Sequence, residues 1–77
     1  MTEARHPRIA MDPRVMVGKP CIKGTRITVE LVLRKLAGGM TPESIVENHP
    51  HLTPDDVRAA VAYAADVIAN EDIVLAS

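Results

Sequence analysis

Cationic and turn-forming side chains gather in one short stretch, residues 18–27. Gly18-Lys19-Pro20 and Lys23-Gly24-Thr25 both favour turns, because glycine supplies positive φ and proline fixes φ while removing a donor. A glycine-bearing loop before a helix invites comparison with a P-loop, in which four residues separate the first glycine from a Gly-Lys-Ser/Thr triplet. Here five residues separate Gly18 from Gly24, and Thr25 follows directly. The spacing therefore argues against a nucleotide cradle.

Recognition of a negatively charged partner is the alternative use for these cations. DNA phosphates or the carboxylates of a partner protein would both suit them. Arg26 is the first candidate for a specific role, because a glycine and β-branched neighbours should hold its backbone in one frame. The structural alternative is an internal ion pair with Glu30 or with an acid of the C-terminal half. The predicted partner- or DNA-binding residues are Arg8, Arg14, Lys19, Lys23 and Arg26.

Cys21 and the histidines are the remaining reactive side chains. Lys19 and Lys23 would lower the pKa of a Cys21 thiol, but no base with an orienting group accompanies it, and a small hydrophobe is the alternative role. His49 and His51 are two positions apart in a turn, where a metal would need further ligands. We therefore expect no catalytic residues, no metal site and no cofactor.

Length and composition predict one small domain that needs a partner. A chain of 77 residues buries only about 60% of its unfolded surface, and its single cysteine excludes an internal disulfide. We find no signal-peptide pattern and no apolar run long enough to span a membrane, which predicts a cytoplasmic protein with no membrane partner.

The charge is divided unevenly along the chain. Residues 1–36 hold eight Lys/Arg against three acids, net +5, and residues 37–77 hold one base against seven acids, net −6. Such asymmetry indicates a charged partner or self-association. Attraction between the two halves within one fold is the alternative.

The N-terminal part reads as short extended pieces. Residues 1–7 are expected to be a flexible arm. Apolar pieces follow at Ile9–Met11, Val15–Val17, Cys21–Ile22 and Arg26–Ile27, and they predict a small hairpin or a strand that needs a partner. We expect the single domain to cover residues 8–70, with an apolar tail at 71–77.

Three helices are predicted after this region, at residues 29–37, 42–48 and 54–69. Thr28, Thr41 and Thr53 are the expected N-caps, and Gly38-Gly39 and His49-Pro50 supply the stops. Short, short and long helices in this order predict a mainly α fold with a helix-turn-helix core, of homeodomain-like type, and a short N-terminal β hairpin or arm.

The third predicted helix is apolar on nearly all sides, which indicates burial on nearly all sides. We expect a core face of Val57, Val61, Ala64 and Ile68. The other face predicts a homodimer interface at Ala62, Tyr63, Ala65 and Ala69. The start of this helix carries Asp55 and Asp56, which would repel DNA phosphate, so it does not look like a recognition helix.

A series of motifs in one order resembles the domain-of-unknown-function 433 family of small bacterial proteins, over about Arg8 to Ile68. The motifs are Asp12-Pro13, Gly18-Lys19-Pro20, Gly24-Thr25-Arg26-Ile27, Leu36-Ala37-Gly38-Gly39, Pro42-Glu43, His49-Pro50, Leu52-Thr53, Asp56-Val57 and Ala62-Tyr63-Ala64, with Ile9, Val15, Ile22, Val29, Leu33, Ile45 and Ala60 between them. Two mild departures are Cys21, where a small β-branched residue is common, and His49, where an aromatic is more usual.

The resemblance implies a homeodomain-like helix-turn-helix fold with an N-terminal β element. It also implies an antitoxin role, because members are often paired with a PIN-like nuclease toxin. The first hypothesis is thus a homodimeric antitoxin that binds a nuclease toxin. The alternatives are a DNA-binding transcriptional regulator that uses the basic N-terminal half, and a plain dimerisation module.

Overall fold

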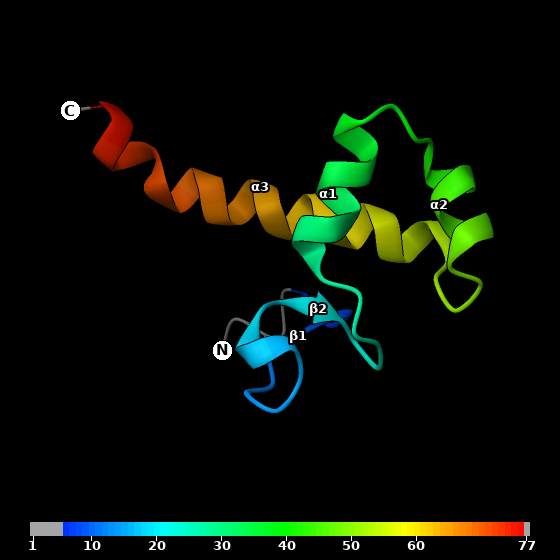
Figure 1. The fold of residues 1–77 in the computed structure, drawn as a ribbon. Coiled ribbons are helices and arrows are strands. Elements are labelled where there is room, and N and C mark those ends of the chain that lie inside the picture. The colour runs from blue at the N-terminus through cyan, green and yellow to red at the C-terminus, as the bar shows by residue number, and fades with distance from the viewer. Residues whose placement is uncertain (1–5, 77) are drawn as a thin grey trace.

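Three helices and a small hairpin make up the fold (Figure 1). The computed structural model describes residues 6–76, with side chains through Asn70. The elements are β1 (Ile9–Ala10), the 3-10 turn η2 (Met16–Gly18), β2 (Cys21–Ile22), α1 (Val29–Ala37), α2 (Pro42–Asn48) and α3 (Pro54–Ala76). The prediction of a mainly α fold with a short N-terminal hairpin is confirmed.

Threonine caps begin the helices as the sequence predicts. Thr28 Oγ1 accepts from the Leu31 backbone N at 3.0 Å, and Thr41 Oγ1 accepts from the Ser44 backbone N at 3.1 Å. At α3 the cap is reciprocal, because Thr53 Oγ1 accepts from Asp56 N while the Asp56 carboxylate accepts from Thr53 N. These bonds satisfy backbone donors that a helix start leaves unpaired.

Two of the three predicted helix ends are confirmed, at Ala37 for α1 and at Asn48 for α2, and the third is wrong. α1 ends at Ala37 in a left-handed cap, with Gly39 at φ 101° and Met40 N donating to Lys35 O at 3.0 Å. α3 continues to Ala76 instead of ending at Ala69. Residues 70–72 contain no glycine or proline, so nothing in the backbone stops the helix there. The side chains of the predicted apolar tail lie outside the described residues.

The hairpin forms between the first and third of the expected extended pieces. Ile9 pairs with Ile22 and Ala10 with Cys21, in an antiparallel register. Thr28 adds an isolated bridge to Cys21 on the other side of β2. The second piece is not extended, because Met16, Val17 and Gly18 have φ values of 50°, 58° and 83° and form a left-handed turn.

The core lies where the first half of α3 meets α1, α2 and the hairpin. In Figure 1, α1 and α2 lie on one side of α3 and the hairpin on the other. On α3, Val57 is buried as expected, but Val61 and Ile68 are 43% and 58% exposed. The core face therefore runs through Val57, Ala60 and Ala64, because the short α1 and α2 cover only this stripe. The buried core residues are Ile9, Ile22, Val29, Val32, Ile45, Leu52, Val57 and Ala60.

No helix in the described part of the chain is long and apolar enough to cross a membrane. Although α3 has 23 residues, its aliphatic side chains are interrupted by charged ones.

Candidate partner-binding surface

Arg8 forms ion pairs within the fold. Its Nη1 lies 3.0 Å from Oδ1 of Asp56, and its Nη2 lies 3.8 Å from Oδ2 of Asp55. Burial acts to raise the pKa of Asp56, but hydrogen bonds from Thr53 and Arg8 outweigh it and hold that pKa below its ordinary value. The pair joins the N-terminal segment to the start of α3, so a partner would have to break it to use Arg8.

Arg14 and Lys19 are also paired within the chain. Arg14 donates from Nε and Nη2 to the two carboxylate oxygens of Asp12, each at 3.1 Å. Its side-chain and backbone hydrogen bonds lower the pKa of Asp12. Lys19 Nζ lies 3.4 Å from Glu30, whose other oxygen accepts from Arg34 Nε at 3.0 Å. The Arg34 hydrogen bond and the Lys19 charge lower the pKa of Glu30. These ion pairs are exposed to solvent, so each contributes little to the stability of the fold.

Lys23 and Arg26 differ from the other three predicted cations. Neither makes an ion pair or a side-chain hydrogen bond with any residue in the described part of the chain. Among the side chains that the structure describes, Arg26 pairs neither with Glu30 nor with an acid of the C-terminal half, and Glu30 instead binds Lys19 and Arg34. The structure therefore separates five predicted cations into three that are paired and two that are free.

The turn that carries these two cations is internally braced. Gly24 adopts φ 81°, a left-handed conformation that a side chain would strain. Thr25 Oγ1 donates to Ile22 O at 2.8 Å and accepts from Ile27 N at 3.0 Å. Because the hydroxyl ties both ends of the turn together, the backbone of Arg26 is held in one frame.

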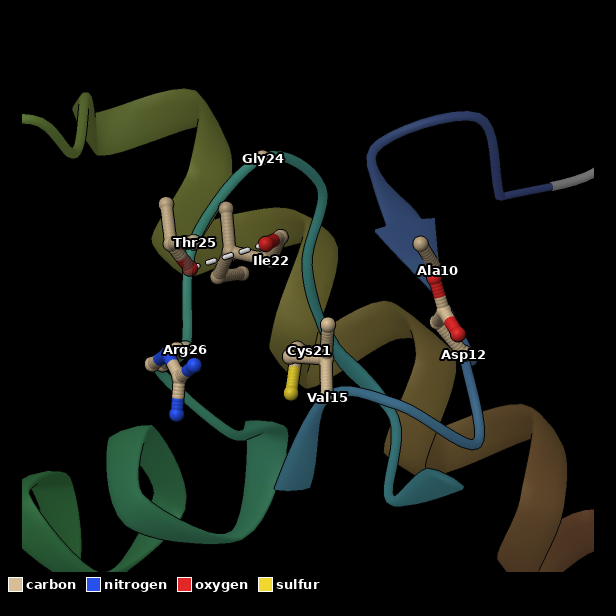
Figure 2. Close-up of a pocket in the computed structure, with 8 residues that line it drawn as sticks. All are labelled: Ala10, Asp12, Val15, Cys21, Ile22, Gly24, Thr25 and Arg26. Carbon is tan, nitrogen blue, oxygen red and sulfur yellow. Dashed lines mark hydrogen bonds between the residues drawn. The ribbon is translucent and has the colours of Figure 1, made fainter. Parts of the chain in front are cut away.

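A hollow of about 430 Å³ lies beside the turn, with Arg26 on one side and Asp12 on the other (Figure 2). Because Asp12 is neutralised by Arg14, the uncompensated charge at the hollow is that of Arg26. The site thus favours a negatively charged group. The lining residues are Ala10, Asp12, Val15, Cys21, Ile22, Gly24, Thr25 and Arg26.

Cys21 is buried at the back of this region. Its side chain is 3% exposed, its Sγ donates to Lys19 O at 3.4 Å, and burial raises the pKa of the thiol. The nearby Lys19 ammonium is directed to Glu30 instead of the sulfur. These contacts favour a packing role over a nucleophilic one.

The three histidines have different surroundings. His6 Nε2 lies 2.7 Å from Asp66 Oδ2, and its ring meets Tyr63 edge to face at 5.4 Å. His49 Nε2 is buried without a hydrogen-bond partner, and His51 is exposed. Among the described residues, no three His, Cys, Asp or Glu side chains are grouped as a metal site requires.

The predicted dimer-interface residues lie on two different surfaces of α3. Tyr63 packs against the core, and its hydroxyl lies 3.9 Å from Met11 Sδ. Ala62 lines a hollow formed with the N-terminal segment. Ala65 and Ala69 are exposed. The structure thus brings part of the predicted interface against the chain's own N-terminal segment.

A second surface was not predicted from the sequence. Leu33, Ala37, Ala64, Val67 and Ile68 line a groove of about 500 Å³ between α1 and α3, called here the α1–α3 groove. The signal that could have located it is the continuation of apolar residues from Ala60 to Ala64, Val67 and Ile68, past the length that a nine-residue α1 covers.

Comparison with known proteins supports one assignment. A structural neighbour, a crystal structure described as a DUF433 member protein from Anabaena variabilis ATCC 29413, has a TM-score of 0.77 and 26% sequence identity. The alignment covers 99% of this chain and 75% of that one. No curated protein matches the chain. The family model described as "Protein of unknown function (DUF433)" matches residues 9–64. This match covers most of the chain, including both the braced turn and the first half of α3, and the chain therefore belongs to the DUF433 family.

Proposed function

We propose that this protein is a non-enzymatic, antitoxin-type protein that binds a PIN-like nuclease toxin. The observation that carries the proposal is the pair of free cations, Lys23 and Arg26, on a turn that Thr25 braces. The resemblance to a family often paired with such nucleases supplies the class of partner.

The chemistry of the partner favours an arginine at this position. Nucleases of this class bind their metal ions with clustered carboxylates. A guanidinium offers two parallel N–H donors to one carboxylate, whereas an ammonium acts as a point charge. Removing one member of a buried, hydrogen-bonded charge pair costs about 2–5 kcal/mol of binding. Arg26 is therefore the residue whose loss should weaken the complex most.

The proposal assigns no reaction and no cofactor to this chain. Cys21 is the strongest nucleophile in the sequence, and its burial and raised pKa oppose thiolate chemistry. The proposed site of action is the cytoplasm, which suits a single reduced thiol.

Co-expression with the product of the adjacent gene tests the proposal. We expect the nuclease to co-purify with the wild-type chain and to be inhibited by it. Arg26→Ala should weaken binding by about tenfold or more. Arg58→Ala is the matched control, because Arg58 is an exposed arginine on α3 that pairs with Asp55 and does not line the hollow. The proposal fails if no neighbouring gene encodes a nuclease, or if both variants bind it equally.

DNA binding is the second candidate function, and the same two cations favour it. The start of α3 is a poor DNA reader, because Asp55 and Asp56 are acidic and already pair with Arg8. Contact through Lys23 and Arg26 alone neutralises two phosphates, which gives a slope of about −1.8 in log K against log salt for each chain.

Fluorescence anisotropy with the chain's own upstream DNA, measured over a salt series, tests this second function. Binding at low salt that Lys23→Ala and Arg26→Ala both remove would support it. The absence of any binding at low salt would exclude it. A plain dimerisation module is the remaining alternative, and it predicts neither nuclease nor DNA binding.

A further inference from the structure

Met11 carries the most exposed sulfur in the part of the chain that the structure describes. It is 58% exposed, against 39% for Met16 and 3% for Cys21, while Met40 packs against the core. Peroxides oxidise the sulfur atoms that solvent reaches, and they attack a cysteine as its thiolate, which burial opposes at Cys21. Met11 is therefore the sulfur that a peroxide reaches first.

The surroundings of the Met11 sulfur decide whether its oxidation has a consequence. The hydroxyl of Tyr63 donates to Met11 Sδ across 3.9 Å. A thioether is a weak acceptor, and a contact of this length contributes little. The Tyr63 ring also meets the His6 ring edge to face at 5.4 Å. One side chain of α3 thus touches the N-terminal segment at two points, and its hydroxyl faces the sulfur.

Oxidation turns this weak acceptor into a strong one. The thioether sulfur attacks one oxygen of a hydroperoxide, so that a sulfur–oxygen bond forms and the oxygen–oxygen bond breaks. The leaving oxygen takes up the proton and departs as water or an alcohol. Sulfur loses an electron pair and the peroxide gains it. The product is a sulfoxide, a polar group whose oxygen accepts hydrogen bonds.

The gap between the Met11 and Tyr63 side chains suits that oxygen. An O–H···O bond spans about 2.7–2.8 Å, so a separation of 3.9 Å leaves room for an oxygen bonded to Sδ and directed at the hydroxyl. Sulfoxide sulfur is chiral. Only one of the two epimers points its oxygen at Tyr63 without turning the Met11 side chain, so the site discriminates between them.

We propose that Met11 is a site of oxidation by peroxides and that Tyr63 binds the resulting sulfoxide. The hydroxyl of Tyr63 donates to the sulfoxide oxygen in a short hydrogen bond. This bond adds to the Arg8–Asp56 ion pair in fastening residues 6–11 to α3. The N-terminal segment is thus held more tightly in the oxidised chain than in the reduced one.

The place of Met11 in the chain connects the oxidation to the candidate site. Its neighbours Ala10 and Asp12 both line the hollow beside Arg26. A sulfoxide held by Tyr63 fixes the residue between them, so the oxidised chain presents a more rigid wall to the hollow. The inference itself concerns the free chain and does not rest on the proposed function.

Peptide mapping by mass spectrometry, after treatment of the full chain with hydrogen peroxide, tests the site of oxidation. We expect Met11 to be oxidised faster than Met16, and several-fold faster than Met40. In urea the three rates should converge, because the three side chains are then equally exposed. Oxidation of Met16 or Met40 at the same rate as Met11 in the folded chain, or at a higher one, would overturn the proposal.

Tyrosine absorbance and fluorescence test the role of Tyr63, because it is the single tyrosine of a chain without tryptophan. A stronger hydrogen bond from the hydroxyl shifts both signals. Peroxide should produce the shift in the wild type and in Met16→Leu, and none in Met11→Leu. Met16→Leu is the matched control, since both changes conserve volume at an exposed methionine. A shift that survives Met11→Leu, or an oxidised wild type without one, contradicts the proposal.

The two methionine sulfoxide reductases, each specific for one epimer, test the geometry of the bond. We expect one reductase to act several-fold more slowly on the oxidised wild type than on oxidised Tyr63→Phe, and the other to act on both chains alike. Tyr63→Phe keeps the aromatic ring against the core and removes only the donor. If neither reductase distinguishes the two chains, the hydroxyl does not hold the sulfoxide and the proposal fails.

Discussion

The two halves of α3 show how differently one continuous helix is held. In the first half, Thr53 and Asp56 cap the helix start, Arg8 pairs with Asp56, and Val57 is buried in the core. In the second half, Val67 and Ile68 are exposed on the face that continues the core. The same helix is thus packed into the core at its start and presents exposed apolar side chains further along.

This difference indicates that hydrophobic composition alone does not locate a core. Val57, Val61 and Ile68 are all aliphatic residues on one helix, and only Val57 is buried. Burial depends on which side of α3 is covered by α1, α2 and the hairpin, which decides the exposure of Val61, and on how far along α3 they reach, which decides that of Ile68. The contrast can be measured by substituting equivalent residues in each half.

The largest expected effect comes from truncating one aliphatic residue in each half. Val57→Ala should lower the free energy of unfolding by about 2–3 kcal/mol, because it removes buried methyl groups and leaves a cavity. Ile68→Ala should change it by less than about 0.5 kcal/mol in dilute solution. Urea denaturation followed by circular dichroism measures both. Equal losses would show that the second half is packed within the single chain.

A smaller loss in the free energy of unfolding is expected when the cap at the start of α3 is removed. Asp56→Ala should cost about 1–3 kcal/mol, because it leaves the Thr53 backbone donor and Arg8 without their acceptor. Asp55→Ala is the neighbouring control and should cost less than about 1 kcal/mol, since its ion pairs are exposed. Thermal unfolding of the two variants side by side checks this order.

The same carboxylate predicts how stability depends on pH. Hydrogen bonds from Thr53 and Arg8 outweigh burial and hold the pKa of Asp56 in the folded chain below its ordinary value, so folding favours the ionised form. Its contribution is present above the unfolded-state pKa and is lost as pH falls through the folded one. The pKa values of Asp12 and Glu30 are also lowered in the folded chain, so these two carboxylates lose their contribution in the same acidic range. Unfolding measured from about pH 6 to about pH 2 should show a shallower decline for Asp56→Asn than for the wild type.

Local signals made the beginnings of the helices predictable. Thr28, Thr41 and Thr53 each cap a helix through a donor three residues later, so the information lies within one turn of chain. The left-handed turn at Val17 was not predictable in this way. A β-branched residue at φ 58° goes against local preference, and backbone hydrogen bonds from Gly18 N to Val15 O and from Lys19 N to Met16 O close the turn around it.

Contacts between distant residues could not be predicted from a single sequence. Arg8 and Asp56 are 48 positions apart, and His6 and Asp66 are 60 apart. The sequence therefore offered five cations as candidates but could not show that three of them pair within the fold. The groove was missed for the same reason, because it depends on where α1 ends relative to α3.

The smallest expected effect is a difference in local opening between the two halves of α3. Hydrogen exchange of the backbone amides measures this opening. The amide of Ala60 should exchange only through global unfolding, because its residue is fully buried where α3 meets the core. The amide of Ala69 should exchange through local opening in dilute solution, because the side chains around it are exposed.

Ala69 belongs to the homodimer interface predicted from the sequence, so raising the protein concentration should slow exchange at its amide. Binding of a partner at concentration [L] stabilises the closed state by RT ln(1 + [L]/Kd), so the protection should rise with concentration and not stay fixed. Ile68→Glu should remove that concentration dependence while leaving dilute exchange at Ala60 unchanged. If exchange at Ala69 is slow at every concentration, the second half of α3 is protected within one chain, and the contrast between the two halves is wrong.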